Sequence, residues 1–233
     1  MILLRRSHER GHAQHGWLDS RHTFSFADYH DRHWMGFGPL RVINEDRVAP
    51  GGGFAPHRHA NMEIISYVIA GGLQHRDSIG NGSVIVPGDV QMMSAGSGIE
   101  HSEFNASQTE SVHFLQIWIQ PDRLNATPRY AQQHFAADSR RGVLKLVASP
   151  DGADSSLPIR QDARMYAATL PAGADIEHTL HSGRRAWVQV VHGRLRLGAD
   201  IALEAGDGAG IADVTQLQLT AERESELLLF DLP

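Results

Sequence analysis

The chain has 233 residues, of which 41% are hydrophobic and 21% charged, and these values are typical of a globular protein with one or two domains. A formal net charge of -6 without a basic run argues against direct nucleic-acid binding. The chain contains no run of about 18 apolar residues, which is the length needed to span a membrane. The chain contains no Cys, which excludes disulfides and thiolate metal sites and suits a reducing cytoplasm. Its fifteen His residues are therefore the prominent candidates for metal ligands.

The first half of the chain has the pattern of short β-strands separated by turns. Gly and Pro clusters mark the turns, and Gly80-Asn81-Gly82 is typical of a β-hairpin. Alternating or β-branched runs between these turns predict strands at residues 40–44, 63–70, 74–79, 83–86, 90–94 and 111–120. Short strands at this spacing indicate a β-sandwich or β-barrel rather than alternating strands and helices.

A polar segment then predicts a link between two domains. Residues 125–141 are mostly polar, and residues 128–135 are predicted to form a short helical turn within this link. We expect an N-terminal domain at 1–124, a linker at 125–141 and a C-terminal domain at 142–233. The β pattern of the C-terminal domain predicts strands at residues 142–148, 165–170, 187–191, 194–197 and 227–230.

The second half of the chain repeats features of the first half. Pro171-Ala172-Gly173 precedes two His residues, and residues 204–207 are similar in sequence to residues 86–89. This repeat predicts two similar β-barrels in one chain. His178 and His181 are three residues apart, which places them on opposite faces of a strand. We therefore expect the C-terminal domain to bind no metal.

Two His clusters, about forty residues apart, predict a metal site in the N-terminal domain. Residues two apart in a strand point to the same face, so His57 projects with His59, and His101 projects with Glu103. If the two strands lie opposite each other, three imidazoles and one carboxylate converge. This set of ligands leaves coordination positions open for water or a substrate.

Other polar residues near these clusters have simpler interpretations. Glu63 shares strand parity with His59, which makes it a further candidate beside the metal. A single His is more often a hydrogen-bonded or exposed side chain than a ligand, so His75 and His113 are interpreted as structural. Asn105 is interpreted as a turn residue.

The clusters and their flanking residues resemble the two cupin motifs, and more specifically the pirin family. Gly51 and Glu63 bracket the first His pair as in cupin motif one, although Arg58 replaces the proline that is usual between the two His residues of a pirin. The resemblance is strongest over residues 16–121, and the phrases that carry it lie at residues 40–46, 75–81, 87–91 and 96–103.

This resemblance implies an all-β bicupin fold, with two jelly-roll β-barrels of which only the first holds a metal. It implies that one divalent metal, Fe(II) in the first place, is bound by His57, His59, His101 and Glu103. Mn, Co, Ni, Cu and Zn also suit these ligands. Glu63 stands where cupins usually have their carboxylate ligand, whereas pirins use the position of Glu103. We expect Glu103 to be the ligand and Glu63 to orient a His or to satisfy a buried group, with both carboxylates as candidates for catalytic proton transfer.

Three functions from different classes fit this site. Some pirins cleave the flavonol quercetin, and the resemblance implies a metal-dependent dioxygenase that acts with O2 on quercetin or a similar enolisable aromatic. The second hypothesis is a non-enzymic regulator whose metal oxidation state changes a surface for a protein partner. The third is a cupin enzyme that does not use O2. All three require the same metal ligands, so the ligands do not separate them.

Overall fold

The computed structural model describes residues 1–233 and contains β-strands and three short 3₁₀ helices, with no α-helix. No element is therefore a helix long and apolar enough to cross a membrane. The chain forms two compact units. The N-terminal unit comprises Gly11–His134 and Ile159–Gln161, and the C-terminal unit comprises Met1–Arg10, Phe135–Pro158 and Asp162–Pro233.

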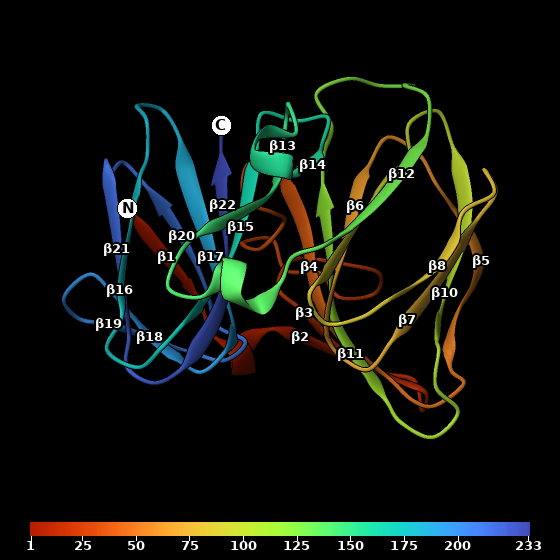
Figure 1. Ribbon diagram of the computed structural model, residues 1–233, viewed down its shortest axis with the longest axis horizontal. Coiled ribbons are helices and arrows are strands. Elements are labelled where there is room, and N and C mark those ends of the chain that lie inside the picture. Colours follow the sequence, from red (N-terminus) through yellow and green to blue (C-terminus); the bar gives the residue numbers. More distant parts are fainter. The chain divides into compact units, whose positions relative to one another are not determined.

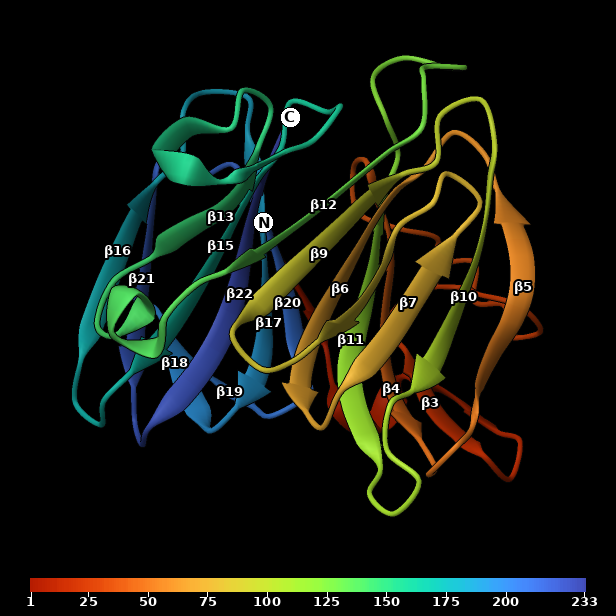
Figure 2. The same ribbon diagram turned by 45° about the vertical axis from the view of Figure 1, so that its right-hand side comes forward.

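The N-terminal unit is built from two antiparallel sheets. Seven strands form one sheet in the order β12-β9-β6-β11-β4-β3-β2, and four form the other in the order β5-β10-β7-β8 (Figure 2). The strands are β2 (Gly11–Gln14), β3 (Leu18–His22), β4 (Leu40–Val48), β5 (Gly53–His59), β6 (Glu63–Ala70), β7 (Leu73–Asp77), β8 (Gly82–Ile85), β9 (Asp89–Ser94), β10 (Ile99–Asn105), β11 (Val112–Ile119) and β12 (Arg129–His134).

The C-terminal unit has the same pair of sheet sizes. Its sheets have the orders β1-β20-β17-β22-β15-β13-β14 and β16-β21-β18-β19 (Figure 1). Its elements are β1 (Ile2–Arg5), η1 (Ser7–Glu9), η2 (Ala137–Arg140), β13 (Lys145–Ser149), η3 (Ala153–Ser155), β14 (Leu157–Pro158), β15 (Arg164–Leu170), β16 (Asp175–Thr179), β17 (Arg185–His192), β18 (Arg194–Leu197), β19 (Ile201–Glu204), β20 (Gly208–Ala212), β21 (Gln216–Ala221) and β22 (Ser225–Leu232). The predicted all-β fold with two similar units is confirmed.

Two separate apolar clusters lie on the inward face of the seven-stranded sheet in the N-terminal unit. On β6, Val68 belongs to one cluster and Ile64 to the other, and the inward position between them is occupied by Ser66. Neighbouring β11 has the same arrangement, since Phe114 lies in the first cluster, Trp118 packs against the second and Gln116 lies between them. A polar layer therefore crosses the sheet where a continuous core would otherwise run.

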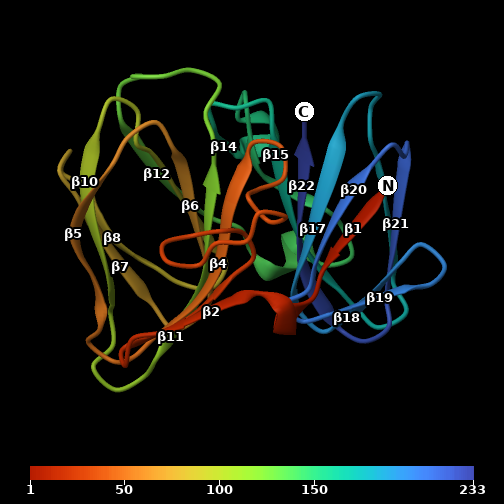
Figure 3. The same cartoon turned by 180° about the vertical axis from the view of Figure 1, so that it is seen from behind.

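Two predictions about the linker and the chain start differ from the structure. Residues 128–135, predicted as a helical turn, contain β12, which pairs with β9 along its whole length. The exposed edge of β9 offers backbone donors and acceptors, and this tertiary pairing outweighs local helix propensity. The first ten residues belong to the C-terminal unit, because β1 pairs with β20 from Ile2 to Arg5 (Figure 3).

We expect Leu229→Ala to lower the free energy of unfolding by about 2–5 kcal/mol, because it leaves a cavity in a packed core. Leu229 is fully buried within the core cluster of the C-terminal unit. Leu124→Ala is the matched control, since Leu124 is 68% exposed and its truncation should cost little. Urea denaturation of both variants, followed by circular dichroism, measures the difference; equal losses would contradict this account of the core.

Candidate metal centre

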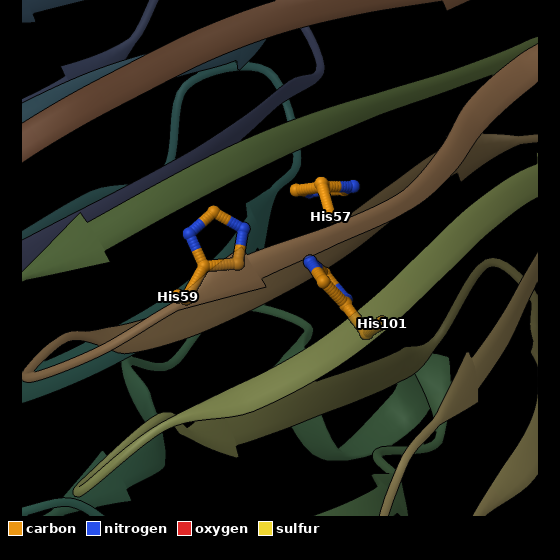
Figure 4. Close-up of side chains that lie close together, drawn as sticks. All are labelled: His57, His59 and His101. Atoms are coloured by element: carbon orange, nitrogen blue, oxygen red, sulfur yellow. The ribbon is translucent and has the colours of Figure 1, made fainter.

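The register between β5 and β10 brings the two predicted His clusters together. His57 lies directly opposite His101 in the antiparallel pair, and His59 lies opposite Ile99. A β-bulge follows His101, so that Glu103 lies opposite Phe54. Figure 4 shows the three imidazoles pointing toward one another, two from β5 and one from β10.

The spacing of the three imidazoles fits a shared metal ion. One ring nitrogen from each of His57, His59 and His101 lies within 4.8 Å of the others. The ring centres are 4.8 Å apart for His57 and His59, 4.5 Å for His57 and His101, and 4.9 Å for His59 and His101. Metal–nitrogen bonds of about 2.1 Å place ring centres about 4.6 Å apart for ligands at right angles and about 5.2 Å for tetrahedral ones. The observed spacing therefore suits three ligands on one face of an octahedron.

Hydrogen bonding leaves the correct nitrogen atoms free to bind a metal. The Nδ1 atom of His57 donates to the carbonyl oxygen of Ala55 at 2.8 Å, which directs its Nε2 lone pair away from the strand. The Nε2 atom of His101 is buried and has no hydrogen-bond partner. A buried ring nitrogen without a partner is costly unless it binds something, and a metal ion would satisfy it.

Burial keeps two of these imidazoles neutral at physiological pH. Desolvation, assisted by the neighbouring His57, lowers the pKa of His59 to about 4. Desolvation, assisted by the neighbouring His57 and His59, lowers the pKa of His101 to about 2. A neutral imidazole keeps its lone pair for coordination, so protons compete weakly with a metal at these two ligands.

A carboxylate oxygen of Glu103 lies within 4.8 Å of ring nitrogens of His101 and His75, and two hydrogen bonds hold the carboxylate in place. Its Oε1 accepts from Ser66 Oγ at 3.1 Å, and its Oε2 accepts from Gln116 Nε2 at 2.6 Å. Burial raises the pKa of Glu103 to about 7, although the Ser66 hydrogen bond opposes this, and the charge of Asp46 raises it further. Each carboxylate oxygen retains a second lone pair, so these hydrogen bonds are compatible with coordination of a metal.

His75 takes part in the centre, which the sequence analysis did not predict. Its side chain is completely buried behind His101, and the Nδ1 atoms of the two rings are 3.5 Å apart. Its Nε2 lies 3.2 Å from Oδ2 of Asp77, and its ring stacks on Tyr130. Asp77 fixes the orientation of the His75 ring, which in turn contacts the ring of His101. His75 and Asp77 are two residues apart in the predicted strand and so share a face, and this spacing could have indicated from the sequence that they pair.

Glu63, which the sequence analysis proposed beside the metal, lies elsewhere. Asn61 has a left-handed φ of 53° in the turn between β5 and β6, so strand parity does not carry from His59 to Glu63. The Oε2 atom of Glu63 accepts from Ser94 Oγ at 2.6 Å and from the backbone N–H of Arg160 at 3.1 Å. Glu63 therefore satisfies buried donors and does not face the three imidazoles.

The remaining polar candidates have structural contacts. His113 lies 2.9 Å from Oε1 of Glu45, and the Asn105 side chain donates to three backbone carbonyls around its turn. Both groups of potential metal ligands in the chain, His57 with His59 and His101, and His75 with His101 and Glu103, lie in the N-terminal unit. In the C-terminal unit, His178 contacts Asp231 at 2.9 Å.

A cavity of about 910 Å³ opens beside the three imidazoles. His57, His59 and Glu103 form part of its wall, and much of the rest is aromatic: Trp17, Phe26, Tyr29, Phe54 and Trp118. The volume lies within the range of pockets that enclose small molecules, and apolar walls with a few convergent polar groups are their usual composition. The centre therefore has an open side that faces a space large enough for a small aromatic molecule.

Comparison with known proteins agrees with this geometry. Residues 4–119 match the family model described as pirin, and residues 146–232 match the quercetinase C-terminal cupin domain. Quercetin 2,3-dioxygenase of Escherichia coli K12 is 47% identical over 100% of this chain and 99% of its own. A pirin-like protein of Caulobacter vibrioides is 44% identical, with 95% of each chain covered.

A solved structure adds information about the metal. The bacterial pirin YhhW of Escherichia coli, in complex with nickel(II), matches with a TM-score of 0.94 and 47% identity, over 100% of this chain and 99% of that chain. Taken with the spacing of the imidazoles, this similarity identifies the centre as a site for a divalent metal.

We expect Glu103→Gln to weaken metal binding strongly and Glu63→Gln to leave it nearly unchanged. Glu103 lies within reach of His101, whereas Glu63 binds only Ser94 and the Arg160 backbone among hydrogen-bond donors. Competition with a chromogenic chelator measures the two affinities side by side. A larger loss in Glu63→Gln would show that the general cupin carboxylate, and not Glu103, holds the metal.

Metal affinity is also expected to rise with pH up to about 7 and then level off. Glu103 has a pKa of about 7 and must lose its proton to bind a cation, so below pH 7 each pH unit should raise the affinity about tenfold. His59 and His101, with pKa values of about 4 and 2, are already neutral in this range and add no slope. Titrations from pH 5.5 to 8 test this, and Glu103→Gln should lower the slope by about one proton per metal ion.

Proposed function

This chain belongs to the pirin family, and we propose that it is a metal-dependent dioxygenase that cleaves quercetin or a similar flavonol with O2. The observation that supports this proposal is the open side of the three-His centre, which faces an aromatic-lined cavity of about 910 Å³. The relatives named quercetin 2,3-dioxygenase cover the whole chain, which gives the substrate class. The small-molecule cavity favours this function over a purely regulatory one.

We propose Fe(II) as the metal, held by His57, His59, His101 and Glu103. Three nitrogen ligands and one oxygen ligand suit several divalent ions, so the ligands alone do not choose among them. A bound metal would lower the pKa of a coordinated hydroxyl and leave room for O2. The roles of the protein side chains follow from their positions.

Glu103 is suited to move a proton at the reacting hydroxyl of the substrate. Glu103 forms part of the cavity wall, and a carboxylate there can accept a proton from the substrate hydroxyl and return it later. Ser66 and Gln116 hold it in place through both oxygen atoms. Glu63, the second carboxylate proposed for catalysis from the sequence, is separated from the cavity and is not assigned this role.

The aromatic wall is suited to hold a planar ring system against the centre. Phe26 and Trp118 meet edge to face with ring centres 5.4 Å apart, and Trp17 and Phe54 do so at 5.1 Å. These rings would bury the apolar faces of a flavonol and exclude water from the deprotonated substrate. Both atoms of O2 would enter the product as the central ring opens and carbon monoxide leaves. The partners we propose are therefore an aromatic small molecule and O2, in a cytoplasmic setting.

We expect quercetin to be consumed at a rate proportional to the metal content of the protein. The reason is that an open coordination position on the metal is the feature of this site that could activate the substrate. Anaerobically purified protein, loaded with increasing amounts of Fe(II), would be mixed with quercetin and air while O2 uptake and carbon monoxide release are recorded. His101→Ala should lose both signals. Fully loaded protein that turns over no flavonol would favour the regulatory hypothesis instead.

A further inference from the structure

The polar layer of the N-terminal unit extends beyond the residues that hold Glu103. Ser66, Gln116, Asn44 and His22 lie side by side on four neighbouring strands, because β6, β11, β4 and β3 pair in a register that aligns them. In the next inward position on β4, Asp46 lies opposite Ser20 of β3. Asn44 and Asp46 have no role in holding the metal ligands through hydrogen bonds, so their burial calls for another explanation.

Asn44 presents an unsatisfied acceptor to the cavity. Its side chain is 3% exposed and forms part of the cavity wall. Its Oδ1 atom is buried and has no hydrogen-bond partner. A buried amide oxygen without a partner costs free energy comparable to a lost hydrogen bond, so such groups are usually paired with protein, water or a ligand.

Asp46 presents a second polar group at the same wall. It is also 3% exposed, it forms part of the cavity wall, and its Oδ1 accepts a hydrogen bond from Ser20 Oγ. Burial raises the pKa of Asp46 to about 7 in spite of the Ser20 hydrogen bond, so its neutral form is accessible near neutral pH.

We propose that Asn44 and Asp46 form a hydroxyl-binding subsite, which selects aromatic substrates with a hydroxyl group in addition to the one at the metal centre. This inference rests on the proposed function and specifies its substrate class. The two side chains lie on one face of β4, about 7 Å apart along the strand. Both offer acceptors, and a carboxyl that is neutral part of the time suits an uncharged phenol better than a cation.

The expected selectivity follows from the cost of leaving these groups unpaired. A site built to hydrogen-bond a hydroxyl disfavours an analogue that lacks it, because the analogue removes water from the buried acceptors without replacing its hydrogen bonds. One such hydrogen bond corresponds to about a tenfold difference in affinity. The aromatic wall, in contrast, contacts the hydroxylated ligand and the analogue without the hydroxyl equally.

The test compares ligands that differ by a single hydroxyl. The metal-loaded protein is titrated under anaerobic conditions with 3-hydroxyflavone, 3,7-dihydroxyflavone and 3,4′-dihydroxyflavone, none of which carries a catechol that could chelate the metal. We expect at least one dihydroxyflavone to bind about tenfold more tightly than 3-hydroxyflavone. Asn44→Leu and Asp46→Leu should remove this preference, because they remove the unpaired acceptors that disfavour 3-hydroxyflavone.

The conservative variants Asn44→Asp and Asp46→Asn keep an acceptor in place and should retain most of the preference; they also replace any leucine variant that fails to fold. Equal binding of all three ligands by the unmodified protein, or equal weakening of all three by the substitutions, would overturn the subsite. Turnover in air separates the two proposals. A hydroxyl preference without turnover removes the dioxygenase function alone, whereas turnover without a preference removes the subsite alone.

Discussion

The functional centre depends on one constraint, which is the antiparallel register between β5 and β10. That register places His57 directly across from His101 and leaves His59 two pairs further along. Side chains alternate between the two faces of a strand, so a slip of one residue would turn one His pair away from the other. Three imidazoles converge because many backbone hydrogen bonds, and not the metal alone, hold the two strands in place.

A second constraint is the partial burial of the centre, which has opposite effects on its two kinds of ligand. Burial disfavours charge, so it keeps His59 and His101 neutral and ready to bind a cation, while it makes the ionised form of Glu103 harder to reach. Ser66 and Gln116 partly offset the second effect. The polar layer that includes them interrupts the apolar core, and we interpret this loss of core packing as the cost of the site.

The sequence predicts the parts of this structure that depend on local geometry. Turn residues and alternating runs mark most strands, and parity within one strand pairs His57 with His59. The same rule does not place Glu63 on the face of His59, because the chain turns at Asn61 before the next strand begins. His75 was missed because its spacing alone does not tell which face of β7 is inward. The strand at β12 was missed because its partner, β9, lies about forty residues earlier and only the tertiary fold brings them together.

The pairing of β1 with β20 has a consequence for how the protein is made. Residues 11–134 form a nearly continuous stretch of one unit, and this stretch can begin to fold while the rest of the chain is still being translated. Strand β1, in contrast, precedes this stretch in the chain but finds its partner only when residues 208–212 have been added. Until then the backbone donors and acceptors that will pair with β20 stay unpaired, which leaves β1 open to pairing with another chain.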